Sequence, residues 1–330
     1  MIIKSRVILI IQTIVILLLS ILLFLSYSTN NDQSMEQDYS DKLLSPRIYA
    51  NVLEPKSYLI VNYAPLKNSI EQYILSNKIS ASVYIENLRS GAFIGINERK
   101  AYHPASLNKV LTAMLISKKI EDDELSWDEM VNIDAFRSNY FGTLYQSKES
   151  KHSVRFLMGQ MLQESDDSAF KTLNNLVDDD DYDLFISYLD YYSDDSLQKT
   201  KPGEDAQHGL ITPKSMYNVF SSLYLSTLLD AQNSEYILTL LSNTSLDIKT
   251  IAQLPFDTKL AHKFGMKYDG KDQFFHDCGI LYIKERRIFY CVMTQDMQKE
   301  SAIQFSAVVV DAIYNYTVLT HETLDEYRDS

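Results

Sequence analysis

Strand-like sequence occurs only near the two ends of the folded part of this chain, and helical sequence fills the middle. Ile79 to Glu86 and Ala92 to Asn97 flank a polar turn as a β-hairpin would, and Asp277 to Thr294 reads as a second pair of strands. Between about Trp127 and Tyr236 apolar residues recur at helical spacing, and Ile303 to Leu319 predicts a closing helix. The sequence therefore predicts an α+β fold. One antiparallel sheet built from both chain ends is flanked by helices and carries an all-helical insertion.

An apolar segment precedes this folded part. Val7 to Leu25 contains no charged residue and is long enough to span a bilayer. Lys4 and Arg6 come before it, and this positive charge orients the N-terminus toward the cytoplasm. A cleaved signal peptide is the alternative, although its apolar core is usually shorter, at about 7 to 15 residues. We expect a single N-terminal anchor in the cytoplasmic membrane, with the rest of the chain on the extracytoplasmic side.

These features divide the chain into three parts. Residues 1–27 are the predicted membrane anchor or signal segment. Residues 28–57 are polar and show no sustained period, so they are interpreted as a tether. Residues 58–330 form the predicted folded domain, and its helical insertion covers about residues 122–240.

The charge balance argues against nucleic acid as a partner. The chain has 31 Lys and Arg against 44 Asp and Glu, and its net charge of −13 repels a polyphosphate. It lacks glycine-rich phosphate loops. Its histidines and cysteines show no HxxxH or CxxC spacing, so we expect no metal and no other cofactor. His262 and His276 lie beside motifs described below, where structural and supporting roles both stay open.

The two cysteines are expected to face each other in the second pair of strands. A turn centred between Lys284 and Glu285 makes Cys278 and Cys291 direct cross-strand neighbours. A disulfide suits an exported protein, but paired strands often miss the torsion that a disulfide needs. The sequence favours two small buried apolar side chains and leaves the disulfide open.

A serine followed three residues later by a lysine is the main candidate for chemistry. Residues i and i+3 share one face of a helix, so the lysine amine can take the proton of the serine hydroxyl. This spacing occurs at Ser106 to Lys109, at Ser168 to Lys171 and at Ser196 to Lys199. Only the first example follows a β-hairpin and Pro104, and it opens an apolar helix that runs to about Ile120. Burial in such a helix lowers the pKa of an amine, so this context selects the first tetrad.

Here the chain resembles the penicillin-recognising serine hydrolases, the family of class A β-lactamases and D-alanyl-D-alanine peptidases, whose Ser-x-x-Lys motif opens the core helix. The resemblance implies a later Ser-Asp-Asn tripeptide, and Ser165-Asp166-Asp167 begins 59 residues after Ser106. It implies a Lys-Thr-Gly tripeptide on a strand, and Lys263-Phe264-Gly265 begins 98 residues after Ser165. Between them, Thr212-Pro213 resembles the family's turn into a helix. The fold implied is class A β-lactamase-like.

The resemblance also implies a role for each matching residue. Ser106 would be the acylated nucleophile and Lys109 its base. Ser165 would relay a proton to the leaving group, and Lys263 would hold the substrate electrostatically while keeping Lys109 from protonating. The backbone N–H groups of Ser106 and Met266 would form the oxyanion hole.

Two positions depart from the family pattern, and both lie on the substrate-binding side. Asp167 replaces an Asn whose amide donates to a substrate carbonyl, whereas a carboxylate only accepts. Phe264, next to Gly265, replaces a hydroxyl residue that the family directs at the substrate carboxylate. An ionised Asp167 beside Lys109 would also raise the pKa of the lysine and oppose its action as a neutral base. These departures predict an unusual substrate or weak activity.

Deacylation depends on a further residue. Class A β-lactamases use a Glu on the loop before the Thr-Pro turn to activate water, in a Glu-x-x-Leu-Asn context. Glu204 is the nearest candidate, but its surroundings, Pro202-Gly203-Glu204-Asp205, do not match, and a solvated turn is the alternative. Without such a Glu the acyl-enzyme would persist, as in the peptidases.

Two functions follow from the sequence. The first is an exported serine hydrolase that forms an acyl-enzyme on Ser106 with a β-lactam or with a peptidoglycan stem-peptide-like acyl-D-alanine substrate. The second is a catalytically silent domain of the same fold that binds a cell-envelope partner. The first function predicts that the Lys109 amine and the Ser165 hydroxyl lie within about 2.6 to 3.2 Å of the Ser106 hydroxyl, or slightly farther in an empty site. A Phe264 ring that plugs the cleft, or a Lys109 that pairs only with Asp167, would favour the second function.

Overall fold

The computed structural model describes residues 43, 62–133, 136–138, 141–191, 209–269, 272–284 and 286–328. By its internal contacts the chain divides into two units, Met1–Asp41 and Lys42–Ser330, and every described residue belongs to the second. The predicted anchor at residues 1–27 therefore lies outside the described residues.

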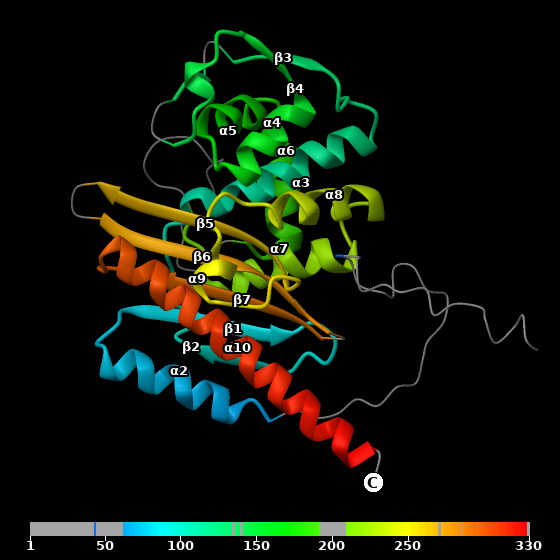
Figure 1. The fold of residues 1–330 in the computed structure, drawn as a ribbon. Coiled ribbons are helices and arrows are strands. Elements are labelled where there is room, and N and C mark those ends of the chain that lie inside the picture. The colour runs from blue at the N-terminus through cyan, green and yellow to red at the C-terminus, as the bar shows by residue number, and fades with distance from the viewer. Residues whose placement is uncertain are drawn as a thin grey trace, which may run out of the picture. The chain divides into compact units, whose positions relative to one another are not determined.

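The helices and strands of the second unit, labelled as in Figure 1, are in chain order α2 (Ala64–Ser76), β1 (Ala81–Asn87), β2 (Phe93–Ile96), the 3₁₀ turn η3 (Ala105–Leu107), α3 (Asn108–Glu121), β3 (Met130–Asn132), the 3₁₀ turn η5 (Leu144–Gln146), β4 (Lys151–Ser153), α4 (Val154–Gln163), α5 (Asp167–Asn174), α6 (Asp179–Leu189), α7 (Pro213–Leu225), α8 (Ala231–Leu241), α9 (Ile248–Ile251), β5 (Lys259–Asp269), β6 (Asp272–Ile283), β7 (Arg286–Thr294) and α10 (Lys299–Arg328).

One five-stranded antiparallel sheet joins the two ends of the described chain. Its strand order is β2-β1-β7-β6-β5, so the first hairpin pairs with the last strand through β1 and β7. Ala81 at the start of β1 lies opposite Thr294 at the end of β7. This arrangement confirms the predicted sheet built from both chain ends.

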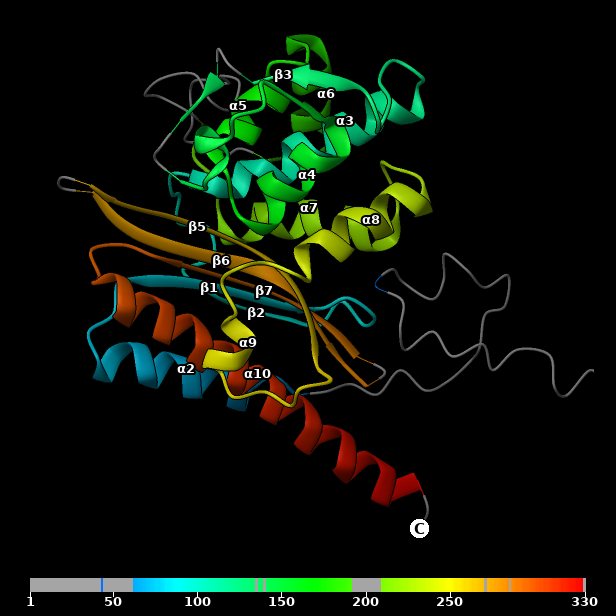
Figure 2. The ribbon, with the colours of Figure 1, turned by 45° about the horizontal axis from the view of Figure 1, so that its top comes forward.

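The sheet separates two apolar clusters, and helices cover both of its faces. Along β7, Phe289, Cys291 and Met293 belong to the cluster on the side of α3, α4, α7 and α8. The alternating residues Tyr290 and Val292 belong to the cluster beneath α2 and α10. Figures 1 and 2 show α2 and α10 lying along one face and the helical region on the other. Burial on both faces explains why β7 is almost entirely apolar.

The region of the predicted helical insertion contains helices and also a small sheet. Met130–Asn132 pairs with Lys151–Ser153 as the two-stranded sheet β3-β4, which the sequence analysis did not predict. Strands of three residues are too short to show a period of two. The Thr-Pro turn forms as expected: Thr212 caps α7 in a capping box with Ser215, and Pro213 takes the first position of the helix.

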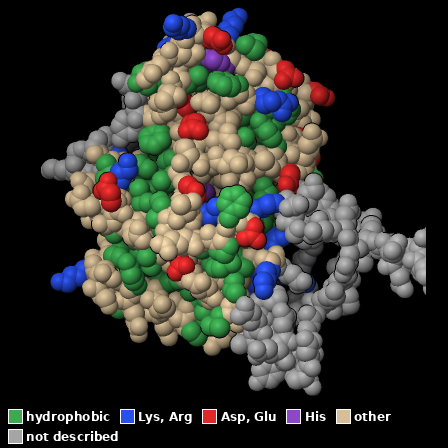
Figure 3. Space-filling view, viewed as in Figure 1, with side chains coloured by type: hydrophobic (Ala, Val, Ile, Leu, Met, Phe, Trp, Pro, Cys, Tyr) green, Lys and Arg blue, Asp and Glu red, His purple; other side chains and the backbone are tan. Residues whose placement is uncertain are grey.

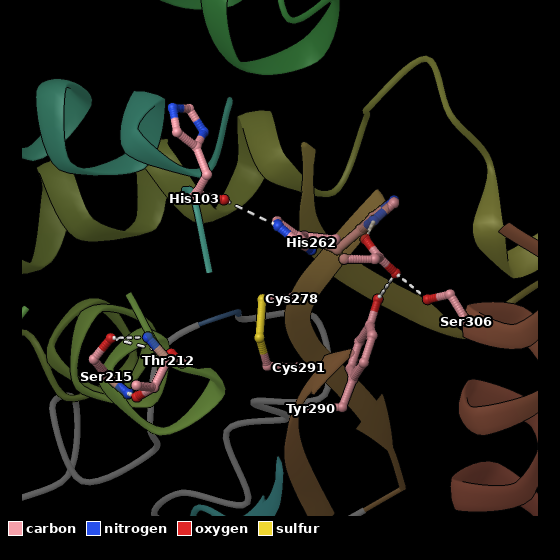
Figure 4. Close-up of a disulfide and its surroundings, with 10 residues drawn as sticks. His103, Thr212, Ser215, His262, Cys278, Tyr290, Cys291 and Ser306 are labelled. Atoms are coloured by element: carbon pink, nitrogen blue, oxygen red, sulfur yellow. Dashed lines mark hydrogen bonds and ion pairs between the residues drawn. A yellow bond between two sulfur atoms is a disulfide. The ribbon is translucent and has the colours of Figure 1, made fainter. Parts of the chain in front are cut away.

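Cys278 and Cys291 are direct cross-strand partners, as the predicted turn requires. Their sulfur atoms lie 2.09 Å apart as a disulfide, which is drawn at the centre of Figure 4. The sequence had favoured two separate buried side chains, and the structure instead contains the alternative. Burial of both residues inside the helical-side cluster places the disulfide in the core.

One residue of the predicted tether contacts the domain. The Leu43 side chain is buried in the helical-side cluster. Its N–H donates to the Glu235 carboxylate at 3.1 Å, and its carbonyl accepts from the Tyr282 hydroxyl at 2.6 Å. Contacts with the domain therefore begin before residue 58.

The described residues contain one helix that is long and apolar enough to cross a membrane, the segment Lys299–Thr320 of α10. Phe305, Val309 and Ile313 of this helix are buried in the cluster beneath the sheet, which is the pattern of a core helix. On the face shown in Figure 3, acidic and basic side chains are scattered among apolar ones.

Candidate active site

Ser106 lies in the 3₁₀ turn that leads into α3, where the backbone is strained just before it. Ala105 has a φ of 48°, a left-handed conformation that a residue other than glycine seldom adopts. The ring of His103 supports this turn, because its Nδ1 accepts from the Ala105 N–H at 3.1 Å. The His103 carbonyl in turn accepts from His276 Nε2 on β6 at 3.0 Å. The turn that presents Ser106 is thus attached to the sheet.

Gly265 on β5 lies directly against the Ser106 turn. A Cβ atom at this position would be 3.0 Å from the Ser106 nitrogen and 3.1 Å from the Ala105 Cβ. Only a residue without a side chain therefore lets β5 approach the turn so closely. Met266, whose backbone N–H the family resemblance assigns to the oxyanion hole together with that of Ser106, is the next residue of β5.

The Ser165 hydroxyl lies between two buried lysine amines. Lys263 Nζ donates to it at 2.9 Å, and Lys109 Nζ donates to it at 3.2 Å. The three residues come from three segments, namely α3, β5 and the turn between α4 and α5. Because both amines donate, the hydroxyl proton of Ser165 is left to be donated elsewhere.

The Lys109 amine makes its hydrogen bonds with Ser165 and Asp167. Its amine donates to the Ser165 carbonyl at 2.5 Å and to Asp167 Oδ1 at 2.6 Å, in addition to the Ser165 hydroxyl. An ammonium group has three protons, so these contacts use all of them. Within the described part of the chain the Ser106 hydroxyl makes no hydrogen bond. The hydrogen bonds that the sequence analysis expected from Ser106 to Lys109 and Ser165 are therefore not formed among the described residues.

Burial lowers the pKa of both amines. For Lys109, loss of solvent is the largest effect and lowers the pKa, while the nearby Asp167 and Asp166 carboxylates raise it in part. For Lys263, burial and then the charge of Lys109 hold the pKa well below its usual value. Burial therefore disfavours the charged form of both amines.

Phe264 lies against a second aromatic ring at the edge of β5. It is only 2% exposed and packs in the cluster beneath the sheet. The Phe141 ring lies 5.8 Å from it, and Lys263 Nζ lies 4.1 Å from the centre of the Phe264 ring. The ring that replaces the family's hydroxyl residue thus gives Lys263 an apolar neighbour with a favourable cation–π contact.

Asp166 fixes the loop that carries Phe141. Its carboxylate accepts from the Ala169 N–H at 2.9 Å, as the N-cap of α5, and from the Leu144 N–H at 2.7 Å. Gly142 has a φ of 87°, and a Cβ there would lie 2.1 Å from the Asp166 carboxylate. The Phe141 carbonyl accepts from the Asp167 N–H at 3.0 Å. The sequence analysis did not identify Phe141, because nothing in its loop matches a motif.

His262 has a structural environment on the side of β5 away from Ser165. Its Nδ1 bonds Asp277 at 2.7 Å, and its Nε2 bonds the Thr244 hydroxyl at 2.7 Å. Tyr290 and Ser306 donate to the other oxygen of Asp277 at 2.7 and 3.0 Å. Figure 4 labels His262, Tyr290 and Ser306 of this group, which lie close together between the strands and α10. The network joins β5, β6, β7 and α10.

The sequence analysis also considered a deacylating Glu and a metal site. Glu204 lies outside the described residues, so its role in deacylation stays a prediction. Among the residues that the structure describes, no group of three or more His, Cys, Asp or Glu side chains is arranged to hold a metal ion.

Comparisons with known proteins agree with this architecture. A family model described as the Beta-lactamase enzyme family matches residues 65–317. The extended-spectrum β-lactamase TLA-3 is 20% identical and superposes with a TM-score of 0.69, over 78% of this chain and all of its own. PBP-A is 16% identical, with a TM-score of 0.67 over 76% of this chain and 95% of its own. A mutant of PBP-A, solved as an acyl-enzyme complex with penicillin G, is 16% identical. It superposes with a TM-score of 0.66, over 80% of this chain and 98% of its own. No curated protein matches the sequence.

Proposed function

The chain belongs to the beta-lactamase enzyme family of penicillin-recognising serine hydrolases, and from this premise we propose that it forms an acyl-enzyme on Ser106. The acyl donor is a β-lactam or an acyl-D-alanine peptide of the kind found in peptidoglycan stems. The penicillin G complex of PBP-A, a protein of the same fold, supports this substrate class.

One observation carries the proposal, the convergence of two buried amines on the Ser165 hydroxyl beside the Ser106 turn. Lys263 and Lys109 lie 2.9 and 3.2 Å from that hydroxyl. Burying a lysine lowers the stability of the fold unless its amine is paired, because burial disfavours the charged form. Two lysine amines beside the Ser165 hydroxyl can accept a proton during the reaction and return it afterwards.

The proposed reaction uses these groups in sequence. Ser106 Oγ bonds to the acyl carbon while its proton passes to the unprotonated Lys109 amine. The backbone N–H groups of Ser106 and Met266 hold the oxygen that becomes negative. The bond between the acyl carbon and the leaving nitrogen then breaks. Ser165 gives its hydroxyl proton to that nitrogen and takes one from Lys109.

The Asp167 contact controls how readily Lys109 acts. Asp167 Oδ1 lies 2.6 Å from the amine and stabilises its protonated form, which cannot accept a proton. Acylation is therefore expected to become faster as the pH rises.

Location is part of the same proposal. The apolar segment Val7 to Leu25 anchors the chain in the cytoplasmic membrane, and the domain lies on the extracytoplasmic side, where peptidoglycan substrates occur.

A second candidate function is favoured by one specific observation. The Lys109 amine pairs with Asp167, and the Ser106 hydroxyl has no hydrogen bond among the described residues. A domain that kept this arrangement with substrate bound would hold a cell-envelope partner without acylation.

Time-resolved intact mass of the full chain in detergent separates the two functions. With penicillin G, the proposal predicts a mass increase of one penicillin in the wild type and none in Ser106→Ala. The lifetime of the adduct distinguishes peptidase-like persistence from β-lactamase-like turnover. Neither an adduct nor loss of penicillin from solution would support the silent binding domain.

A further inference from the structure

Asp167 has one oxygen atom committed to Lys109 and one without a partner. Oδ1 accepts a hydrogen bond from the Lys109 amine, and the backbone N–H of Asp167 donates to the Phe141 carbonyl. Among the described residues, Oδ2 has no hydrogen-bond partner. The side chain is 17% exposed, whereas the Lys109 side chain that it contacts is 2% exposed. The unpaired oxygen is thus the part of this pair that a ligand can reach.

The side chains around Ser165 carry opposite charges at different positions. Lys263 lies on β5 and Asp167 at the start of α5, and both are joined to Ser165, the former directly and the latter through Lys109. A substrate carbonyl gains nothing at Asp167, because both groups only accept hydrogen bonds. A substrate ammonium gains a charge-assisted hydrogen bond there, and a substrate carboxylate is drawn to Lys263.

We propose that Asp167 selects acyl donors that carry a protonated amine next to the acylamino group, so that the preferred substrate is a zwitterion with its carboxylate toward Lys263. This inference rests on the proposed acylation of Ser106. The substrate amine has a second effect, because its positive charge beside Asp167 offsets the negative charge that holds the proton on Lys109. A cationic substrate therefore promotes the unprotonated lysine that its own acylation needs.

Three penicillins test the charge at this position with little other change. Ampicillin carries an ammonium on the carbon beside its side-chain carbonyl, penicillin G carries hydrogen there, and carbenicillin carries a carboxylate. The second-order rate constant for acylation is measured by intact mass at pH 7 and low ionic strength. The wild type is expected to prefer ampicillin over penicillin G by roughly tenfold, the effect of one charge-assisted hydrogen bond, and to acylate most slowly with carbenicillin.

Two variants identify the residue responsible. In Asp167→Asn the ratio of ampicillin to penicillin G is expected to fall close to one. Glu164→Gln removes one negative charge from an exposed side chain three positions away, and its ratio is expected to match the wild type. If Asp167→Asn fails to fold, the relative acylation rates of the wild type with the three penicillins still test the inference.

The outcomes separate this inference from the function on which it rests. Equal rates with ampicillin and penicillin G, or an unchanged preference in Asp167→Asn, overturn the inference and leave the acyl-enzyme intact. Absence of any adduct with all three penicillins overturns the proposed function and the inference together.

Discussion

At the scale of single residues, the environment of Lys109 is what most distinguishes this site. The amine donates to three oxygen atoms, and one of them belongs to Asp167, where the family pattern has an Asn. Burial lowers the pKa of this lysine, and the Asp167 carboxylate acts in the opposite direction. In the proposed reaction, the balance of these two effects sets the pH at which Lys109 can accept a proton.

Replacing Asp167 shifts that balance in a predictable direction. Asp167→Asn removes the carboxylate that stabilises the charged amine, so the pKa of Lys109 falls. The rising limb of the acylation rate against pH should therefore move to lower pH. Penicillin G acylation followed by mass between pH 5 and 10 measures the shift. Glu164→Gln provides the control, and a rising limb that stays in place contradicts this account of Lys109.

At the scale of elements, the contact between β5 and the Ser106 turn is the most demanding feature. Gly265 permits it, and the strained Ala105 is held by His103 and, through it, by His276. A residue in a left-handed conformation costs about 1–2 kcal/mol, which the contacts on both sides of the turn must offset.

Gly265→Ala should damage the site more than the fold. The new Cβ at 3.0 Å from the Ser106 nitrogen pushes β5 away from the turn, and a small displacement of reacting groups lowers the acylation rate by about 10- to 100-fold. Gly159→Ala is the matched control, because its Cβ meets only the flexible Gln163 side chain at 3.4 Å. Replacing this helical glycine should raise the free energy of unfolding by about 0.5–1 kcal/mol and leave acylation unchanged. Equal acylation by both variants would argue against a close approach of β5.

His276 makes the stability of the domain sensitive to acid. Burial lowers its pKa to about 4 from an ordinary 6.5, so between these values the unfolded chain binds the proton and the folded protein does not. Stability is therefore full above about pH 6.5 and falls as the pH drops toward 4, by about 3 kcal/mol in total. His276→Gln should remove this part of the loss. Urea unfolding of both proteins at pH 7, 6, 5 and 4 measures it, and parallel curves would falsify the assignment.

Most elements of the fold were predictable from the sequence, for identifiable reasons. The apolar period of α3, the turn before α7 and the register of Cys278 with Cys291 each depend on neighbours in sequence. The β3-β4 pair has no such signal, since each strand is only three residues long. The strand β5, with Lys263 and Gly265, was found only through the family resemblance.

Contacts between distant segments were the least predictable part of the site. The sequence placed Asp167 beside Lys109 and left open whether the amine pairs with Asp167 or with Ser106. In the structure the amine bonds Asp167 and Ser165. Phe141 could not be anticipated because its partner Phe264 lies more than a hundred positions away. The disulfide depended on strand geometry that a register alone does not determine.

At the scale of the whole molecule, the sheet is covered on both faces and α10 forms part of the core. Its apolar side chains, including Phe305 and Ile313, are buried beneath the sheet. A membrane association of the chain should therefore depend on the N-terminal apolar segment and not on α10.

Deletion of residues 1–27 tests this assignment. The full chain is expected in the membrane fraction, resistant to extraction by high salt, and the shortened chain in the soluble fraction. Protease added to cells that have lost the cell wall but keep an intact cytoplasmic membrane should digest the domain of the full chain. Membrane association that survives the deletion would transfer the anchor to another part of the molecule, with α10 as the first candidate.

The position of the acyl group tests the central claim most directly. The full chain is treated with penicillin G, denatured in acid to trap the adduct, digested with trypsin and sequenced by mass spectrometry. The account predicts the penicilloyl mass on Ser106 within the peptide Ala101 to Lys109, and no label on Phe156 to Lys171, which contains Ser165 and Ser168. A label on the second peptide, or no labelled peptide at all, would contradict the assignment of Ser106 as the nucleophile.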